Sequence, residues 1–181
     1  MIVFIKLLEI TMRKIYPKLY LDLDGVQCDF NGAIQKARES RFKNIEDIEE
    51  IITGISHEGS ESVRKLFAEL EPLSEGTMIR EWCGINFVPF TVLSAPMRGE
   101  LHASIQGKRE WLDAHVPGSS YDALFTNMKH KFAMSDGTPN VLVDDYSPNL
   151  QAWTDAGGIA IKHRQGMIES TLEQLTAIYL K

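Results

Sequence analysis

The sequence predicts an α/β fold with a mainly parallel, doubly wound sheet. Short apolar runs alternate with segments of helical pattern over most of the 181 residues, which is typical of a parallel sheet with helices on both faces. In addition, four of the five expected strands end in polar, chemically capable side chains. Because ligands of such sheets bind beyond the carboxyl ends of the strands, these side chains are expected to share one edge.

The first strand is expected within residues 19–23 and ends in an acidic pair. This run is apolar and contains an aromatic residue, as buried strands do. Asp22 and Asp24 are two residues apart, so they project to the same side at the strand's end. Gly25 then allows a sharp turn beside them. Two adjacent carboxylates repel each other unless a cation neutralises them. Because Mg²⁺ prefers oxygen ligands, a bound Mg²⁺ ion is the expected cation here.

A helical insertion is expected after this strand. Asp29 or Asn31 is a candidate helix cap. Two groups of apolar residues then recur at helical spacing without a strand between them, namely Ile45, Ile48, Ile51 and Ile52, and Val63, Leu66, Phe67 and Leu70. We therefore expect residues 33–76 to form a small helical cap, and residues 16–32 and 77–181 to form the core domain.

The alternation of strands and helices resumes at Phe87. Further strands are expected at residues 87–93, 121–125, 140–145 and 158–162, and helices at residues 100–115, 147–157 and 168–180. The polar residues that follow these strands are Ser94, then residues 127–131, then Asp144 with Asp145. These groups and the first acidic pair are expected at the same edge of the sheet.

Composition narrows the class of protein. The net charge of −6 and the pI of about 5.4 argue against a protein that coats a nucleic acid, which would present a basic face. Cys28 and Cys83 form no C-x-x-C pattern, so a reducing cytoplasm without disulfides is expected.

Residues 1–15 are interpreted as an appendage, with Met12 as an alternative start. Their apolar part is too short to span a bilayer and lacks the pattern of a signal peptide.

The residue types at the expected edge fit phosphoryl transfer. A carboxylate can attack phosphorus, and a metal ion can neutralise both the phosphate oxygens and the nucleophile. A hydroxyl and a lysine can bind the remaining oxygens. A second carboxylate can protonate the leaving alkoxide and then activate water.

Four segments together resemble the motifs of the haloacid dehalogenase-like (HAD) phosphohydrolase superfamily. They are Asp22-Leu23-Asp24-Gly25-Val26, Thr91-Val92-Leu93-Ser94, a downstream lysine, and Val143-Asp144-Asp145. Within the superfamily, these motifs and the segment Gly107-Lys108-Arg109-Glu110-Trp111-Leu112 resemble the 5′(3′)-deoxyribonucleotidases and their small bacterial and phage relatives. The resemblance implies a Rossmann-like, three-layer αβα sandwich with the cap inserted after the first strand.

The resemblance also implies roles for individual residues. Asp22 matches the nucleophile, and Asp24 matches the general acid/base, whose backbone carbonyl is also a metal ligand. Ser94 matches the phosphate-binding hydroxyl, and Asp145 matches the metal-binding carboxylate with Asp144 in support. Lys129 is favoured over Lys131 as the phosphate-binding lysine.

These roles imply an Mg²⁺-dependent phosphohydrolase that acts on small phosphomonoesters through an aspartyl-phosphate. (Deoxy)nucleoside monophosphates are the first candidates for the substrate. A phosphatase or phosphotransferase of sugar phosphates and other small metabolites, or a phosphate-binding protein without turnover, are the alternatives. No nucleic-acid polymer and no membrane is expected as a partner, and the sequence leaves the oligomeric state open.

Overall fold

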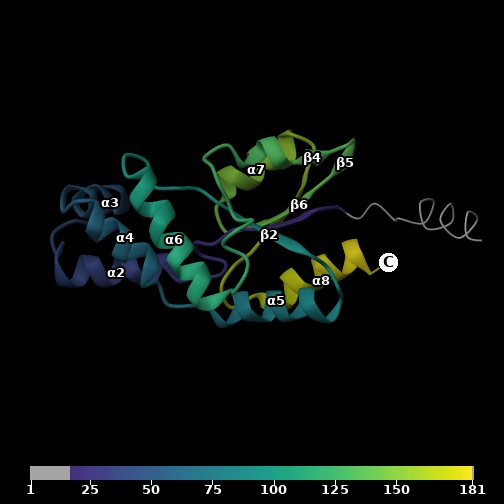
Figure 1. The fold of residues 1–181 in the computed structure, drawn as a ribbon, viewed down its shortest axis with the longest axis horizontal. Coiled ribbons are helices and arrows are strands. Elements are labelled where there is room, and N and C mark those ends of the chain that lie inside the picture. Colours follow the sequence, from purple (N-terminus) through teal and green to yellow (C-terminus); the bar gives the residue numbers. More distant parts are fainter. Residues whose placement is uncertain (1–16, 181) are drawn as a thin grey trace, which may run out of the picture.

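The computed structural model describes residues 17–180, and its centre is a sheet of five parallel strands (Figure 1). The strands lie side by side in the order β3, β2, β1, β6 and β7. Their bounds are β1 Leu19–Leu21, β2 Phe90–Ser94, β3 Leu124–Phe125, β6 Val141–Asp144 and β7 Ile159–Lys162. The predicted α/β class with a mainly parallel sheet is confirmed. The predicted appendage, residues 1–15, lies outside the described residues.

Seven α-helices and one short 3₁₀ helix are described in residues 17–180. The α-helices are α2 Phe30–Ser40, α3 Ile48–His57, α4 Ser60–Ala68, α5 Ser74–Ile85, α6 Leu101–His115, α7 Ser147–Asp155 and α8 Ile168–Tyr179. The 3₁₀ helix is η1 Lys129–Phe132, and a small antiparallel pair consists of β4 Met134–Ser135 and β5 Thr138–Pro139.

Helices cover both faces of the sheet because side chains alternate along each strand. On the central strand β1, Leu19 and Leu21 join a buried cluster with residues of α5 and α8, whereas Tyr20 joins a cluster with Trp153 of α7. Val92 of β2 packs with Trp111 of α6. Accordingly, α5 and α8 lie below the sheet and α7 lies above it in Figure 1. This three-layer arrangement buries the faces of the sheet. The carboxyl ends of its strands are not covered by these layers, so functional side chains can be placed there.

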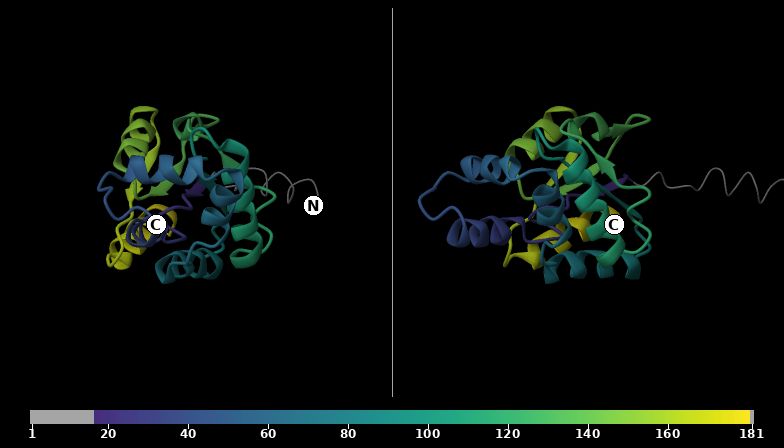
Figure 2. Two further views of the ribbon diagram at one scale, coloured as in Figure 1. Left: turned by 90° about the vertical axis from the view of Figure 1, so that its left-hand side faces the viewer. Right: turned by 60° about the vertical axis from the view of Figure 1, so that its left-hand side comes forward.

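Helices α2, α3 and α4 lie outside the three layers, at one end of the molecule (Figures 1 and 2). Helix α2 begins where Asp29 accepts a hydrogen bond from the backbone N–H of Gly32, as a helix cap does. Helix α4 packs on α6, where the Arg64 and Glu110 side chains form an ion pair. The chain then returns through α5, so residue 76, the expected end of the cap, falls inside α5.

Several local features differ from the prediction. Helix α5 was not predicted, and β3 comprises only Leu124–Phe125 of the expected residues 121–125. Strand β2 starts at Phe90 rather than residue 87, because Phe87 has a positive φ of 54° and Pro89 has no N–H to donate to a strand. The β4–β5 hairpin was not predicted. Its turn contains Asp136 and Gly137, both with positive φ, and an Asp-Gly pair is a known hairpin signal that could have indicated it.

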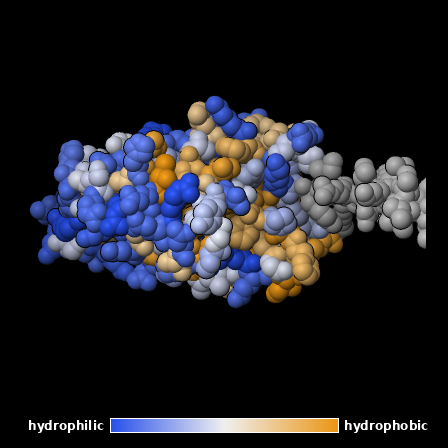
Figure 3. All heavy atoms as spheres, viewed as in Figure 1, coloured by the Kyte–Doolittle hydropathy of each residue, from blue (hydrophilic) through white to orange (hydrophobic). Residues whose placement is uncertain are grey.

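The surface differs between the two ends of the molecule. Figure 3 shows a mostly hydrophilic face over α2–α4 and more apolar surface at the opposite end. A hollow of about 490 Å³ at that opposite end is lined by Leu180 and by Phe87, which is 92% exposed. No helix among residues 17–180 is long and apolar enough to cross a membrane.

Candidate active site

A tight loop follows β1 and holds the first acidic pair. The carbonyl oxygen of Leu23 accepts hydrogen bonds from the backbone N–H groups of Val26, Gln27 and Cys28. This loop turns at Gly25, whose φ of +73° favours glycine. The chain therefore folds back at once, and Asp22 and Asp24 remain at the carboxyl end of the central strand.

Asp22 is buried and fixed on several sides. Its side chain is only slightly exposed, and its backbone N–H donates to the carbonyl of Val143 on β6. Its Oδ1 accepts the backbone N–H of Leu23 at 2.7 Å, and its Oδ2 lies 2.8 Å from Nζ of Lys129. Asp22 is thus held in one orientation before any ligand arrives.

The ammonium group of Lys129 lies between Asp22 and a second carboxylate. Its Nζ also lies 2.7 Å from Oδ2 of Asp144, and its side chain is buried. Burial lowers the pKa of Lys129, but the neighbouring charges of Asp22 and Asp144 outweigh this effect and raise it. The lysine therefore stays cationic between the two carboxylates.

A different lysine binds Asp24. The Nζ of Lys108, on α6, lies 2.5 Å from Oδ2 of Asp24 and 2.8 Å from Oγ of Ser94. It also donates to the carbonyl of Ala95 at 2.6 Å. Burial raises the pKa of Asp24, and the charge of Lys108 opposes that rise. Ser94 is fully buried at the end of β2, beside this ion pair.

The second acidic pair follows β6, and its two members differ in their partners. Asp144 is fully buried and accepts hydrogen bonds from the backbone N–H of Tyr146 and from the side chains of Asn149 and Lys129. Asp145 is half-buried. Burial, with the nearby charges of Asp22, Asp144 and Asp24, raises the pKa of Asp145 to about 7. The surroundings of the Asp145 carboxyl group, which are buried and negatively charged, would therefore favour a bound cation.

The donor set fits a divalent metal ion. One carboxylate oxygen from each of Asp22, Asp144 and Asp145 lies within 4.8 Å of the others. Together with Asp24, these residues place four carboxylates against the two ammonium groups of Lys108 and Lys129, which leaves two negative charges uncompensated. Oxygen ligands and this excess of negative charge suit a divalent cation.

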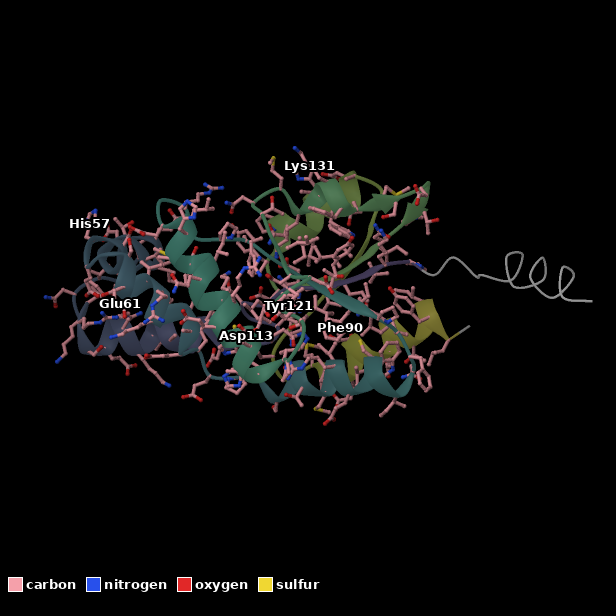
Figure 4. All side chains as sticks on the ribbon, in the orientation of Figure 1. His57, Glu61, Phe90, Asp113, Tyr121 and Lys131 are labelled. Carbon is pink, nitrogen blue, oxygen red and sulfur yellow. The ribbon has the colours of Figure 1, made fainter. Side chains whose placement is uncertain are left out.

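The structure brings together every site residue that the sequence pointed to. Five of them, Asp22, Asp24, Ser94, Asp144 and Asp145, lie at the carboxyl ends of β1, β2 and β6 or just beyond them, and Lys129 reaches Asp22 and Asp144 from η1. Of the two lysines left open, Lys129 lies in the site, whereas Lys131 is exposed and points outward (Figure 4). Cys28 is buried beside Asp24, and burial raises the pKa of its thiol.

Sequence reasoning missed the role of Lys108. This lysine lies on a stripe of buried residues that recurs at helical spacing along α6, formed by Ala103, Ser104, Gly107, Lys108, Trp111 and Leu112. The signal was available, because a lysine one turn before a buried Trp-Leu pair shares their face of the helix. Asn149, which donates to Asp144, was also not assigned.

Comparison with known families and structures agrees with this geometry. The family described as 5′ nucleotidase, deoxy (pyrimidine), cytosolic type C protein (NT5C) matches residues 14–167. No curated protein matches the chain. A crystal structure of a dehalogenase is 11% identical, with a TM-score of 0.57 over 94% of this chain and 100% of that one.

A haloacid dehalogenase-like hydrolase from Streptococcus pneumoniae is 10% identical, with a TM-score of 0.54 over 92% of this chain and 99% of that one. At such identities these two structures show the fold alone. The family match covers most of the chain, including both acidic pairs and both site lysines. The chain therefore belongs to the NT5C family of 5′-nucleotidases, within the HAD superfamily, and is a phosphatase of the 5′-nucleotidase type.

Proposed function

We propose that this protein is an Mg²⁺-dependent phosphatase of small phosphomonoesters, with (deoxy)nucleoside monophosphates as its preferred substrates. The observation that carries the proposal is the pairing of each aspartate of the first acidic pair with its own buried lysine, Asp22 with Lys129 and Asp24 with Lys108. The two carboxylates therefore have different surroundings, which suits two different chemical roles.

Asp22 is the nucleophile. Its carboxylate attacks phosphorus, the bond between phosphorus and the ester oxygen breaks, and an aspartyl-phosphate forms on Asp22. The contacts with Leu23 and Lys129 hold the carboxylate in place, so little orientational entropy remains to be lost during the attack.

Asp24 is the general acid and general base. In the first step it donates a proton to the departing alkoxide oxygen, and in the second it accepts a proton from the water that attacks the aspartyl-phosphate. The second step releases phosphate and regenerates Asp22. A raised pKa favours the protonated form that the first step needs.

Lys129 and Ser94 bind the phosphate. An ammonium group has three N–H donors. Among the described residues, two of the donors of Lys129 are directed at Asp22 and Asp144, so the third is available for a phosphate oxygen. The hydroxyl of Ser94 lies at the end of β2, beside Lys108 and Asp24.

Asp22, the backbone carbonyl of Asp24 and Asp145 would hold the metal ion, with Asp144 in a supporting position. Asp144 is fully buried and accepts hydrogen bonds from Tyr146, Asn149 and Lys129, whereas Asp145 is half-buried, so Asp145 is the better direct ligand. When bound, Mg²⁺ would neutralise charge on the phosphate oxygens and on the nucleophile.

Helices α2–α4, residues 30–68, serve as a cap, and the proposed cap range of residues 33–76 therefore begins inside α2. They lie at the end of the molecule beyond the sheet (Figure 1). Phe67 of α4 contacts Lys108 of the site, with Nζ 4.8 Å from the ring centroid. A cap so near the reacting groups leaves room for a small ester and can shield it from bulk water.

Phosphate release should be measured on a panel of deoxynucleoside monophosphates, sugar phosphates and a 2-haloacid. We expect release from the nucleotides with Mg²⁺, loss of release with EDTA, and recovery when Mg²⁺ is returned. The same assay with Asp22→Asn should show no release. Chloride release from the haloacid without phosphate release from any ester would refute the proposal, as would activity that survives complete chelation.

A further inference from the structure

We infer that Lys108 is a positioning residue, which holds the Asp24 carboxylate in register with the Ser94 hydroxyl and so directs proton transfer to the leaving group. The inference rests on the role of Asp24 in the proposed function. It adds a second lysine to the site, with a task different from that of Lys129.

The contacts of Lys108 exclude a phosphate-binding role. Its ammonium group has three N–H donors, and three acceptors lie within 2.8 Å, namely Asp24 Oδ2, Ser94 Oγ and the carbonyl of Ala95. Its side chain is 0% exposed. Lys108 is therefore saturated by protein groups, and it acts on the reaction through Asp24 and Ser94.

Asp24 depends on Lys108 for its orientation. Its other carboxylate oxygen, Oδ1, faces the thiol of Cys28 at 3.8 Å, which is a weak contact. The carboxylate of Asp22 lies in the same acidic pair and repels it. Without the ammonium group, Asp24 would lose its strong partner and keep its repulsive one, and its carboxylate would turn away.

Lys108 itself is placed by the packing of α6 against α4. At the preceding residue, Gly107, an added Cβ would lie 2.2 Å from the carbonyl oxygen of Arg64 on α4, so only glycine permits this approach. The approach brings the ring of Phe67, also on α4, to 4.8 Å from Nζ of Lys108, where an ammonium group is attracted to an aromatic face. The position of the lysine thus depends on both helices.

Two substrates that differ in their leaving groups test this inference. An alkoxide from a deoxynucleoside monophosphate needs a proton to depart, whereas p-nitrophenolate departs as a stable anion. In Lys108→Met we expect kcat/KM for the nucleotide to fall by about 10²-fold, the cost of a misplaced catalytic group. The fall for p-nitrophenyl phosphate should be at least tenfold smaller, and Asp24→Asn should show the same pattern.

Arg109→Met is the matched control. This neighbour on α6 donates to the carbonyl of Ser120 and lies over the ring of Phe125, so its loss disturbs the helix but not Asp24. It should leave the ratio of the two kcat/KM values unchanged. Equal losses on both substrates in Lys108→Met would overturn the inference, because a purely structural residue would behave in that way.

Rescue by a conservative variant gives a second comparison. Lys108→Arg keeps a charge and N–H donors, so it should retain more of the nucleotide activity than Lys108→Met. An arginine variant as impaired as the methionine variant on the nucleotide would count against the inference. If Lys108→Met fails to fold, the two substrates are compared in Lys108→Arg instead. We then expect a greater loss of kcat/KM for the nucleotide than for p-nitrophenyl phosphate. Equal losses on both substrates would again contradict the inference.

A crystal structure of Lys108→Met separates this inference from the proposed function. It should show the Asp24 carboxylate rotated away from Ser94, whether or not the wild-type protein hydrolyses nucleotides. An Asp24 carboxylate that keeps its place without Lys108 would overturn the inference. Wild-type protein inactive on every ester would instead refute the proposed function.

Discussion

Gly25 and Asp145 lie so close that no side chain fits between them. An ideal Cβ placed on Gly25 would lie 2.1 Å from Oδ2 of Asp145 and 2.4 Å from its Cγ. The two residues belong to the loops that follow β1 and β6, which are neighbouring strands of the sheet. The turn after the first acidic pair thus sets where the second acidic pair places its carboxylate.

Replacing Gly25 with alanine should therefore displace Asp145. The added methyl group would also sit at a φ of +73°, which costs about 1–2 kcal/mol for a residue with a side chain. We expect Gly25→Ala to fold with reduced stability and to need much more Mg²⁺ for half-maximal activity. Titration of phosphatase activity with Mg²⁺ and a thermal melt would measure the two effects.

Gly137→Ala is a control for the strain alone. Gly137 has a similar φ of +78°, but nothing lies within 4 Å of its added Cβ. This variant should lose similar stability and keep the wild-type Mg²⁺ requirement. If Gly25→Ala also kept that requirement, Asp145 would not be the metal ligand.

The two aspartates of the first pair should fail in different ways. Asp22→Asn removes the nucleophile and should abolish turnover of every phosphomonoester. Asp24→Asn should lower kcat/KM for a nucleotide by about 10²–10⁴-fold, which is the usual contribution of general acid–base catalysis. Thermal melts should show that both variants fold. Asp22→Asn protein with wild-type turnover would place the activity at another site.

Lys129 and Lys131 provide a matched pair two residues apart. Lys129→Met removes the cation between Asp22 and Asp144, so KM should rise and kcat should fall, and Asp22 should lose its fixed orientation. Lys131 is exposed (Figure 4), so Lys131→Met should resemble the wild type. Kinetics that reversed this order would reassign the phosphate-binding lysine.

The strands and acidic pairs were predictable because each signal is local. An apolar run that ends in Asp22 and Asp24, or in Asp144 and Asp145, marks both a strand and its functional end. The choice between Lys129 and Lys131 was harder to predict, because it depends on how the single turn of η1 packs against α7. Neither lysine carries a sequence signal for its direction.

Lys108 was missed for a different physical reason. A lysine within an amphipathic helix is expected on the solvated face, because burying an unpaired charge is costly. Here the cost is offset by Asp24, which lies 84 positions away in the sequence. The stripe of buried residues on α6 can indicate that Lys108 is buried, but its distant partner is identified only when α6 is placed against β1 and β2.

The raised pKa of Asp145 makes a prediction about pH and stability. Its folded pKa of about 7 exceeds the ordinary value of 3.8, so between these values the folded state binds a proton that the unfolded state does not. Stability from this group is therefore present at low pH and lost as pH rises through 7. In the metal-free protein, the ionisation of this carboxyl group should therefore make Tm fall as the pH is raised from 5 to 8.

The variant Asp145→Asn isolates that contribution. Relative to this variant, the metal-free wild type should lose Tm from pH 5 to pH 8, and at pH 8 the variant should be the more stable protein. Added Mg²⁺ should raise Tm of the wild type at pH 8 and have little effect on the variant. Parallel pH profiles for the two proteins would show that Asp145 has an ordinary pKa.

The last prediction concerns the approach of α4 to α6. In Gly107→Ala the new methyl group would meet the backbone carbonyl of Arg64 at 2.2 Å and Cβ of Phe67 at 2.9 Å. A backbone carbonyl within a helix cannot turn aside, so α4 must shift as a unit, and overpacking of this kind costs about 1–3 kcal/mol. Because Lys108 is the next residue, the shift should also reduce nucleotide turnover.

Gly84→Ala separates this packing effect from the intrinsic preference of helices for alanine. Gly84 lies in α5 with nothing within 4 Å of its added Cβ, so the substitution should stabilise the protein by up to about 1 kcal/mol. Denaturant unfolding of both variants, with kcat/KM for a nucleotide, gives the comparison. We expect Gly84→Ala to gain stability with unchanged turnover and Gly107→Ala to lose both. A Gly107→Ala protein as stable and active as the wild type would mean that α4 does not rest on α6 as described, and that Lys108 is not held from that side.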